Sequence, residues 1–477
     1  MRNLTLLTDF YELTMMQGYF KNKTNPTVVF DMFYRVNPND GGYAICCGLD
    51  QVINYIKKLR FTYEDIDYLR NLEVFDEDFL DYLAGFHFTG DIYAIPEGSI
   101  VFPMEPIIKV VAPIMEAQLI ETAILCIINH QSLIATKASR VCYAAKGEPV
   151  MEFGLRRAQG PDAATLGARA AVIAGCVGTS NVYCAKKYSV PALGTHAHSW
   201  IMSFPDEITA FRKYAELYPH NTTLLVDTYD TLRSGVPNAI KTFTELRDKG
   251  RMPKVYGIRL DSGDLSYLSK KARKMLDEAG FTDAVICASS DLDEYLIESL
   301  KLQGAKINTW GVGTNLITSK DCPAFGGVYK LAAMKEGDEF IPKIKISENQ
   351  WKITNPGNKT IYRVYDKVTG NIHADLICLA DETFDENEDL LLFDPINTWK
   401  KTLLEAGTYT LREMLVPIFV NGTCVYESPS VMEIRDYCLK EQNTLWEETR
   451  RFVNPHNVYI DLSKKLWDLK QELLAQH

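Results

Sequence analysis

From Pro149 onward, short runs of apolar and β-branched residues alternate with longer stretches in which apolar positions recur at helical spacing. Each short run has the length of a strand and ends in small, polar or charged residues. Strands and helices in alternation predict a parallel sheet covered by helices, as in a (β/α) barrel. The predicted strands lie at 150–153, 176–177 (a weaker member), 192–193, 223–226, 255–260, 284–288, 306–310 and 328–331.

Polar residues at the expected helix ends agree with this alternation. Ser262 and Asp264 can cap a helix that runs to Glu278 and stops at Gly280, because a side-chain oxygen accepts hydrogen bonds from the first-turn N–H groups. Near the N-terminus, Asp9 is a candidate N-cap with Glu12 three positions into the helix. From its local sequence, this N-terminal segment is therefore a capped helix start.

The rest of the chain lacks the alternating pattern. Short strands at 27–34 and 90–94 are mixed with helices, and the stretch 119–145 is expected to be helical. After residue 340 the pattern dissolves without a linker-like composition, so the last part is expected to pack back on the first. We expect an N-terminal α/β domain over 1–130, a catalytic (β/α) barrel over 131–340 and a C-terminal segment over 341–477.

Composition excludes several function classes. The formal net charge is −11 and no basic stripe is present, which argues against a nucleic-acid partner. The eleven cysteines include no CxxC motif, so zinc-ligand spacing is absent and a reducing compartment is expected. Charged and polar residues interrupt the apolar stretches at 1–20 and 107–134, which predicts neither a signal core nor a membrane span. We expect a cytoplasmic enzyme without a membrane partner.

Polar and charged residues gather directly after the predicted strands. In a (β/α) barrel the loops that follow the strands meet at one edge of the sheet and carry the chemistry. We therefore expect residues far apart in the chain to surround a single active site. The clusters lie at 153–157, 178–181, 194–198, 227–230, 259–264, 289–291, 311–314 and 326–327.

Two glycine-rich turns suit phosphate binding. They are the run Gly311-Val-Gly313-Thr314-Asn315 and the pair Gly326-Gly327. Backbone N–H groups without a neighbouring Cβ can surround an anion, although each turn taken singly is also typical of an ordinary tight connection. Neither matches a P-loop or a dinucleotide-binding fingerprint. Together they favour the phosphate site that barrels often place on their late strands.

The run Asp261-Ser-Gly-Asp264 offers carboxylates for sugar hydroxyls or for hydrated Mg²⁺, besides its role as a helix cap. Arg259 lies on the same face of its strand as Asp261, two positions earlier. Arg259 can form a structural ion pair with Asp261 or a fork for a ligand carboxylate. The residues alone leave these alternatives open.

His196 and His198 form an HxH pair after a predicted strand. A metal pair would need further histidine ligands at other strand ends, and the remaining histidines lie elsewhere. One histidine can instead be a nucleophile or phosphoryl acceptor oriented by a carboxylate such as Asp227. A purely structural histidine is the third interpretation.

Taken together and in this order, the motifs resemble those of the nicotinate phosphoribosyltransferase family, and the likeness spans nearly the whole chain. The resemblance implies an irregular parallel (β/α) barrel of the type II phosphoribosyltransferase kind, packed on an α/β domain built from N- and C-terminal segments. The motifs are Leu7-Thr-Asp-Phe-Tyr11, Glu152-Phe-Gly-Leu-Arg-Arg-Ala-Gln-Gly-Pro-Asp162, Gly194-Thr-His-Ala-His-Ser-Trp200, Asp227-Thr-Tyr-Asp-Thr231, Gly257-Ile-Arg-Leu-Asp-Ser-Gly-Asp264 and Gly326-Gly-Val-Tyr-Lys-Leu331.

The resemblance implies a reaction in which nicotinate displaces pyrophosphate from C1 of phosphoribosyl pyrophosphate and gives nicotinate mononucleotide for NAD synthesis. An oxocarbenium-like transition state needs positioning and charge stabilisation, with Mg²⁺ on the leaving group. Family members couple the reaction to ATP hydrolysis through a phosphorylated histidine that matches His198, and Asp227 matches the carboxylate that holds it. No permanent metal site on the protein is implied.

The resemblance also assigns the ligand-binding residues. The pyridine ring is stacked between Phe153 and Tyr11, and Tyr11 comes from the neighbouring subunit of a homodimer with shared active sites. Arg35 of the same neighbour resembles a pyrophosphate contact. The remaining assignments place Arg156 and Arg259 at the pyridine pocket, Asp261 at the ribose, and Gly313, Thr314, Gly326 and Gly327 at phosphoribosyl pyrophosphate.

Ser180 bears on substrate choice. Related nicotinamide enzymes carry an Asp in this loop, which accepts a hydrogen bond from the carboxamide. Ser180 adds no negative charge, so a nicotinate carboxylate meets a donor without repulsion, and Thr195 is a further donor. Nicotinate is favoured over nicotinamide. The alternatives are a nicotinamide phosphoribosyltransferase and, less favoured, a metal-dependent barrel hydrolase.

Overall fold

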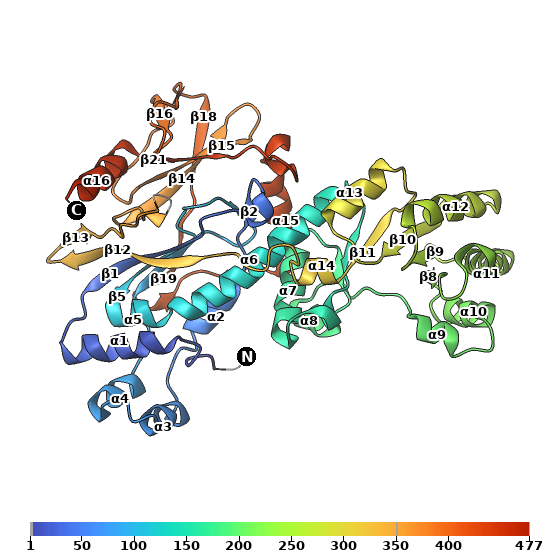
Figure 1. The fold of residues 1–477 in the computed structure, drawn as a ribbon, viewed down its shortest axis with the longest axis horizontal. Helices are drawn as coiled ribbons and strands as arrows, with labels where there is room; N and C mark the ends of the chain where they lie inside the picture. Colours follow the sequence, from blue (N-terminus) through green and yellow to red (C-terminus); the bar gives the residue numbers. More distant parts are fainter. Residues whose placement is uncertain (1–2, 350–351, 477) are drawn as a thin grey trace. The chain divides into compact units, whose positions relative to one another are not determined.

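The computed structural model describes residues 3–349 and 352–476 (Figure 1). The chain divides into two compact units. Unit 1 consists of Met1–Leu133 and Ala324–His477, and unit 2 is the continuous segment Ile134–Pro323. The first boundary falls inside helix α6 (Glu121–Ala144), which accounts for the lack of a linker-like sequence there. Unit 1 is therefore built from both ends of the chain.

Unit 2 contains a six-stranded sheet in which every neighbouring pair is parallel. The strand order is β7-β6-β11-β10-β9-β8, so the sheet is open and β7 and β8 are its edges. An isolated parallel bridge between Ala192 and Thr179 adds a short seventh segment beside β7. The strands are β6 (Val150–Glu152), β7 (Gly178–Thr179), β8 (Asn221–Leu225), β9 (Val255–Leu260), β10 (Val285–Ser289) and β11 (Thr309–Val312).

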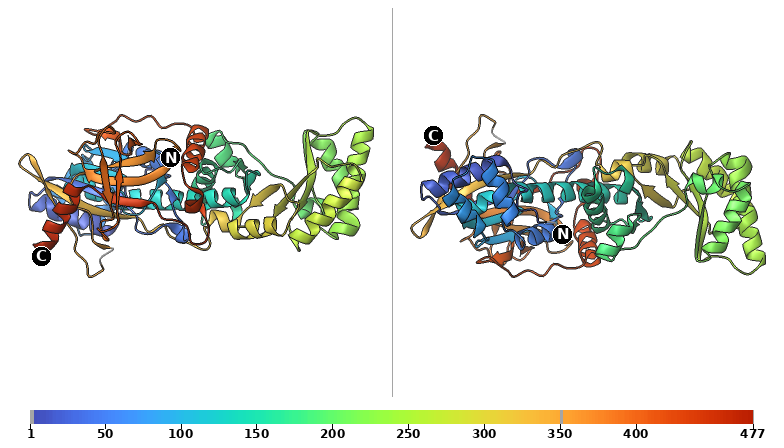
Figure 2. Two further views of the ribbon diagram at one scale, coloured as in Figure 1. Left: turned by 90° about the horizontal axis from the view of Figure 1, so that it is seen from above. Right: turned by 90° about the horizontal axis from the view of Figure 1, so that it is seen from below.

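Helices follow the strands of unit 2, and α10, α11 and α12 form a row that packs beside β8, β9 and β10 (Figures 1 and 2). Asp264 caps α12 by accepting a hydrogen bond from Tyr267 N–H, which confirms the predicted cap. The helices are α7 (Pro161–Ile173), α8 (Val182–Tyr188), α9 (His198–Met202), α10 (Glu207–Leu217), α11 (Val236–Asp248), α12 (Leu265–Glu278), α13 (Glu294–Leu302) and α14 (Thr314–Ile317).

One predicted strand of the barrel belongs elsewhere. The run 328–331 opens β12 (Val328–Glu336), which pairs antiparallel with β1 (Thr27–Phe33) in unit 1. Tyr329 of β12 stacks on Phe30 with ring centroids 4.7 Å apart, and its hydroxyl donates to the Ala117 carbonyl at 2.8 Å. This buried aromatic side chain finds its partners in unit 1. An apolar run predicts a strand but does not specify which sheet it joins.

Unit 1 contains a seven-stranded sheet of order β13-β12-β1-β5-β3-β19-β20 and a four-stranded sheet of order β18-β14-β15-β21. Two short pairs, β2-β4 and β16-β17, complete its strands. The strands not yet given are β2 (Ala44–Ile45), β3 (Asp91–Ala94), β4 (Ile100–Val101), β5 (Ile108–Pro113), β13 (Glu339–Pro342), β14 (Lys359–Asp366), β15 (Ile372–Leu379), β16 (Leu390–Phe393), β17 (Lys401–Leu404), β18 (Tyr409–Glu413), β19 (Val416–Val420), β20 (Thr423–Cys424) and β21 (Tyr459–Leu462).

The helices of unit 1 come from the N-terminal and the C-terminal parts of the chain. Asp9 precedes the first of them, as predicted, but its side chain makes no capping hydrogen bond. Across the residues that the structure describes, no helix combines the length and apolar character needed to span a bilayer. The helices are α1 (Phe10–Lys21), α2 (Leu49–Ile56), α3 (Tyr63–Asn71), α4 (Glu77–Ala84), α5 (Ile114–Leu119), α15 (Val431–Asn443) and α16 (Lys464–Ala475).

Candidate active site

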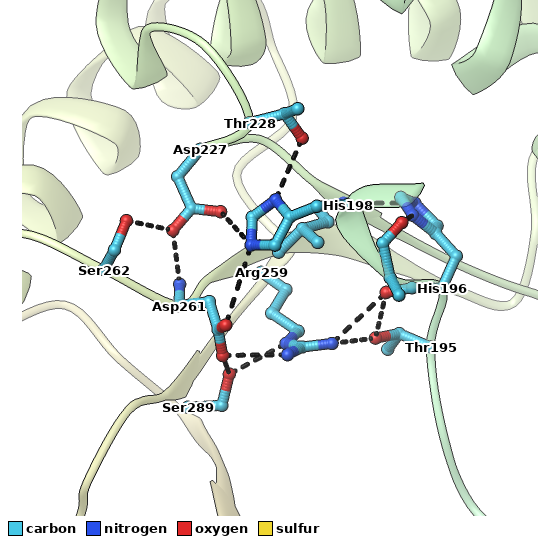
Figure 3. Close-up of polar contacts among 11 residues, drawn as sticks. Thr195, His196, His198, Asp227, Thr228, Arg259, Asp261, Ser262 and Ser289 are labelled. Carbon is cyan, nitrogen blue, oxygen red and sulfur yellow. Dashed lines mark hydrogen bonds and ion pairs between the residues drawn. The ribbon is translucent and has the colours of Figure 1, made fainter. Parts of the chain in front are cut away.

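A cluster of polar side chains lies at the carboxyl ends of β8, β9 and β10 in unit 2 (Figure 3). Asp227 follows β8, Arg259 and Asp261 flank the end of β9, and Ser289 ends β10. His198 is the first residue of α9. Parallel strands put their carboxyl ends on one edge, so side chains distant in sequence meet here.

The Arg259 guanidinium is the centre of the cluster. Its Nε donates to Ser289 Oγ and its Nη2 to Asp261 Oδ1, both at 2.8 Å. Its Nη1 donates to Thr195 Oγ1 at 2.7 Å and to the His196 carbonyl at 3.3 Å. A guanidinium has five N–H donors, so protein acceptors among the described residues use four of them. Arg259 therefore forms the structural ion pair with Asp261 and holds Thr195 as well, which leaves one donor for a ligand.

Asp261 is held as a carboxylate. Burial raises the pKa of Asp261. Hydrogen bonds from Ser289 and Arg259, together with the charge of Arg259, outweigh this effect, so the pKa lies below its usual value. Ser289 Oγ donates to the same oxygen that accepts from Arg259. The other oxygen, Oδ2, lies 3.7 Å from His198 Nε2. Asp261 can thus present negative charge to a sugar, a cation or a histidine at neutral pH.

His198 points its two ring nitrogens at different partners (Figure 3). Nδ1 lies 3.1 Å from Thr228 Oγ1, and Nε2 lies 4.0 Å from Asp227 Oδ1. Asp227 is buried, and its Oδ2 accepts from the Asp261 N–H and from Ser262 Oγ. Its Oδ1 has no hydrogen-bond partner among the described residues. Carboxylates on the Nε2 side favour a proton there, so Nδ1 accepts from the Thr228 hydroxyl and can act as a nucleophile when a substrate replaces that hydrogen bond.

His196 has different surroundings from His198. Its side chain is buried, and its Nε2 accepts a hydrogen bond from the Leu225 N–H at 3.2 Å. Burial lowers the pKa of His196 to about 4, and the charges of Arg259 and His198 lower it too. The Nε2 lone pair is used within the protein, which argues against a metal pair with His198. No cluster of three or more candidate metal ligands occurs in the described ranges.

Three further residues that the resemblance assigns to nicotinate, Phe153, Arg156 and Ser180, lie around β6 and β7 in the same unit. Phe153 follows β6 and donates its N–H to the Val312 carbonyl of β11 at 2.8 Å. Arg156 is exposed in the short helix η2 (Leu155–Arg157), and Ser180 is half-buried after β7. A Cβ on Gly311 would lie 2.6 Å from the Phe153 ring, so this glycine makes room for the ring.

Glu152 was missed as a functional candidate, although a carboxylate ends the buried strand β6. It accepts from Thr179 Oγ1 at 2.5 Å and from the Gly154 N–H, and its carbonyl accepts from the Ser180 N–H at 2.9 Å. Burial raises the pKa of Glu152, while the two hydrogen bonds oppose the rise. Glu152 ties the turn that carries Phe153 to the turn that carries Ser180. An acidic residue inside an apolar run was the available signal.

Two further predicted residues, Tyr11 and Arg35, belong to unit 1. The Tyr11 side chain on α1 is 45% exposed, and the partial burial of its hydroxyl together with nearby Glu121 raises its pKa to about 12. Arg35 follows β1 and lines a cavity of about 740 Å³ within unit 1. Burial lowers the pKa of Lys330, and the like charges of nearby Lys345 and Arg35 lower it too. Sequence reasoning assigned no role to Lys330 or Lys345.

The glycine pair was predicted to lie at a strand of the parallel sheet, and that prediction is wrong. Gly326 and Gly327 precede β12, which is not a strand of the parallel sheet. Gly327 donates its N–H to Asn129 Oδ1 at 3.1 Å, and a Cβ there would lie 2.2 Å from the same oxygen. Gly313 and Thr314 do follow β11, on the predicted edge.

Three family models match successive parts of the chain. The nicotinate phosphoribosyltransferase N-terminal domain matches residues 6–129, the nicotinate phosphoribosyltransferase family model 149–354, and the C-terminal domain 358–470. A nicotinate phosphoribosyltransferase from Bacillus subtilis is 45% identical over 476 residues, covering 99% of this chain and 96% of that protein. One from Dictyostelium discoideum is 34% identical, covering 98% and 88%.

Solved structures agree with the sequence comparison. The human nicotinic acid phosphoribosyltransferase superposes with a TM-score of 0.84 at 27% identity, covering 98% of this chain and 99% of that one. A nicotinate-nucleotide pyrophosphorylase from Pyrococcus furiosus shares the fold, with a TM-score of 0.71 at 24% identity and coverage of 93% and 96%. The chain belongs to the nicotinate phosphoribosyltransferase family.

Proposed function

We propose that this chain transfers the phosphoribosyl group of phosphoribosyl pyrophosphate to the ring nitrogen of nicotinate, and that His198 couples the transfer to ATP hydrolysis. This proposal rests on the cluster of four side chains at the carboxyl ends of the parallel strands, in a chain of this family: His198, Asp227, Arg259 and Asp261. In the transfer, the pyridine nitrogen forms a bond to C1 of the ribose as the C1–pyrophosphate bond breaks. The products are nicotinate mononucleotide and pyrophosphate.

Asp261 and Arg259 have separate roles in this proposal. Asp261 stays ionised beside Arg259, so it can accept from a ribose hydroxyl and oppose the positive charge that develops on the sugar. Arg259 fixes Asp261 and Thr195, and its remaining donor suits the nicotinate carboxylate. Phe153 and the partner subunit's Tyr11 stack on the pyridine ring, and Arg156 lies on the pyridine side. The partner subunit's Arg35 binds phosphoribosyl pyrophosphate together with Gly313, Thr314, Gly326 and Gly327.

His198 Nδ1 is the proposed phosphoryl acceptor. Asp227 and Asp261 lie on the Nε2 side and stabilise a proton there, including the charged ring that forms on phosphorylation. The bond between ATP and its γ-phosphoryl group breaks as the Nδ1–phosphorus bond forms, and ADP leaves. Water later cleaves the phosphohistidine and releases phosphate. The charged ring is attracted to both carboxylates, so phosphorylation changes the electrostatics of the ribose site.

Mg²⁺ enters this proposal with phosphoribosyl pyrophosphate and ATP. The fitting observations are the ionised Asp261 and the buried Asp227 Oδ1, which has no hydrogen-bond partner among the described residues, since Mg²⁺ prefers carboxylate oxygen and water. Asp261 and Asp227 would hold the hydrated ion, which when bound neutralises charge on the leaving pyrophosphate.

Two further parts of the proposal concern substrate choice and assembly. Ser180 adds no negative charge to the pyridine side, so nicotinate is preferred to nicotinamide. The exposed Tyr11 and the cationic group of Arg35, Lys330 and Lys345 suit a homodimer in which each subunit completes the site of the other. The proposed compartment is the cytoplasm.

The test measures pyrophosphate release from phosphoribosyl pyrophosphate with nicotinate or nicotinamide, with and without ATP. We expect a preference for nicotinate and stimulation by ATP. His198→Ala should remove the stimulation and the acid-labile label from γ-³²P-ATP, whereas the exposed control His220→Ala should keep both. A preference for nicotinamide, or ATP stimulation that survives in His198→Ala, would overturn the corresponding part of the proposal.

A further inference from the structure

The parallel sheet of unit 2 is open between its edge strands β7 and β8, and we call this gap the seam. Among the residues that the structure describes, β8 pairs only with β9, and Leu225 lies opposite Arg259 in that pairing. The next N–H, of Val226, donates to the Arg259 carbonyl. Because successive residues of a strand point their N–H groups to opposite sides, the Leu225 N–H points away from β9. Leu225 is fully buried, so this donor needs an acceptor from another part of the chain.

The His196 ring supplies that acceptor. Its Nε2 lies 3.2 Å from the Leu225 nitrogen, where a neighbouring strand would offer a carbonyl oxygen. The ring meets Tyr214 of α10 edge-on, with centroids 4.5 Å apart and an interplanar angle of 63°. An accepting Nε2 requires the proton on Nδ1, which faces the Ala197 carbonyl at 3.5 Å. The side chain thus combines an aromatic body with a neutral acceptor.

The segment that carries His196 is fixed at both edges of the sheet. Ala192 bridges to Thr179 of β7, and the Leu193 N–H donates to the Thr179 carbonyl at 2.9 Å. Three residues after Leu193, His196 attaches the chain to β8. The segment therefore spans from β7 to β8 and closes the open side of the six-stranded sheet with one side-chain hydrogen bond.

This anchor lies between two residues of the active site. Thr195 Oγ1 and the His196 carbonyl both accept from Arg259 Nη1. His198, two positions later, begins α9 and directs its ring toward Thr228 and the two carboxylates. A shift of His196 away from β8 would move the acceptors of Arg259 and the start of α9 together.

We propose that His196 is a positioning residue: its neutral ring closes the seam between β7 and β8 by accepting from Leu225, and so holds Thr195 and His198 in register with Arg259 and Asp261. The catalytic part rests on the function proposed above. The seam itself can be tested without any activity.

Two variants separate the acceptor from the ring. His196→Phe keeps an aromatic body against Tyr214 but offers no lone pair, whereas His196→Gln can present Oε1 to the Leu225 N–H. A buried donor left unpaired costs about 1–3 kcal/mol, which corresponds to roughly 5- to 150-fold. We expect amide hydrogen exchange at Leu225 to accelerate by roughly that factor in His196→Phe and to stay near the wild-type rate in His196→Gln.

The same two variants, His196→Phe and His196→Gln, can be compared by steady-state kinetics. We expect kcat to fall roughly 10- to 100-fold in His196→Phe with a small change in the KM for phosphoribosyl pyrophosphate, because misplaced groups reduce the rate more than binding. His196→Gln should recover most of kcat. The control His373→Phe, a half-buried histidine of β15 in unit 1, should leave both kcat and Leu225 exchange unchanged.

The pH dependence of stability gives an independent check. Unfolded His196 binds a proton below pH 6.5, whereas in the fold its ring, facing Arg259, His198 and Tyr214, has a pKa of about 4. The unfolded state therefore binds more protons between these values, and this contribution to stability is lost as the pH falls from 6.5 to 4. His196→Gln should lack it, so its melting temperature should fall less than that of wild type across that window.

Different results would overturn the two parts of the proposal, the acceptor role of His196 and its positioning role. Equal losses in His196→Phe and His196→Gln, or wild-type Leu225 exchange in His196→Phe, would overturn the acceptor role. Faster Leu225 exchange with unchanged kcat would overturn the positioning role. If the wild-type protein itself failed to transfer the phosphoribosyl group, the proposed function would fall, and Leu225 exchange would still decide whether His196 closes the seam.

Discussion

At the scale of single residues, side chains of the same type have different surroundings in the site and therefore different roles. His196 and His198 are two positions apart, yet one is buried and neutral with its Nε2 bonded to the backbone, and the other is half-exposed beside two carboxylates. Asp261 is held ionised by Arg259, whereas burial raises the pKa of Glu152. Environment, and not residue type, separates the groups that react from the groups that hold them in place.

Ser180 gives a prediction at this scale. Ser180→Asp would place a carboxylate where the nicotinate carboxylate is proposed to bind, and like charges a few ångströms apart repel by a few kcal/mol at an effective dielectric of about 20. We expect kcat/KM for nicotinate to fall at least 10-fold, with a smaller fall or a gain for nicotinamide. Ser203→Asp, at the exposed end of α9, is the matched control. Equal effects on both substrates would contradict a pyridine-side location for Ser180.

At the scale of elements, the apolar pattern predicted most of the parallel sheet. The runs at 150–153, 223–226, 255–260, 284–288 and 306–310 correspond to β6, β8, β9, β10 and β11. The same pattern assigned 328–331 to that sheet, although β12 pairs with β1. Burial and β-branching show that a strand forms, and pairing depends on partners hundreds of residues away.

The site was partly predictable for the same reason. Residues that follow parallel strands meet by topology, so Asp227, Arg259, Asp261 and His198 were found from strand ends. Tyr11 and Arg35 follow no strand of that sheet, and their assignments came only from the family resemblance. The hydrogen bond between the Leu225 N–H and His196 could not be predicted, because a single side-chain acceptor at a sheet edge produces no periodic pattern in the sequence.

Gly311 gives a prediction about β11 and its neighbour. A Cβ at this position would lie 2.6 Å and 2.7 Å from two ring carbons of Phe153, so Gly311→Ala must displace the ring that is proposed to stack on nicotinate. We expect the KM for nicotinate to rise roughly 10-fold or more, with a smaller effect on the KM for phosphoribosyl pyrophosphate. Gly18→Ala on α1, where the added methyl would meet open space, is the control. Unchanged nicotinate kinetics in Gly311→Ala would argue against stacking on Phe153.

At the scale of the whole molecule, the predicted ligand-binding residues divide between the units. Phe153, Ser180 and His198 belong to unit 2, whereas Tyr11 and Arg35 belong to unit 1. The proposed homodimer accounts for this division, since one subunit's unit 1 residues complete the partner's site. An enzyme of this design is active only as an assembly.

Subunit mixing tests the shared site. Tyr11→Ala and His198→Ala proteins should each lose ATP-coupled turnover, because every site in either homodimer lacks one of the two residues. In a heterodimer, one site lacks both and the other is intact. Random reassociation makes half of the dimers mixed, so about a quarter of wild-type turnover should return. Mixtures that stay inactive after verified subunit exchange would place Tyr11 and His198 in the same subunit's site.

The interrupted construction of unit 1 has a consequence for chain synthesis. Strand β1 is flanked by β5 and β12, and the whole of unit 2 lies in the chain between the paired residues Phe30 and Leu331. A growing polypeptide that has reached Pro323 already contains every strand of the parallel sheet, while β1 still waits for one neighbour. The reacting groups are thus encoded in the segment that can become compact first, and the half-formed sheet around β1 carries an unpaired edge until the ribosome has passed Glu336.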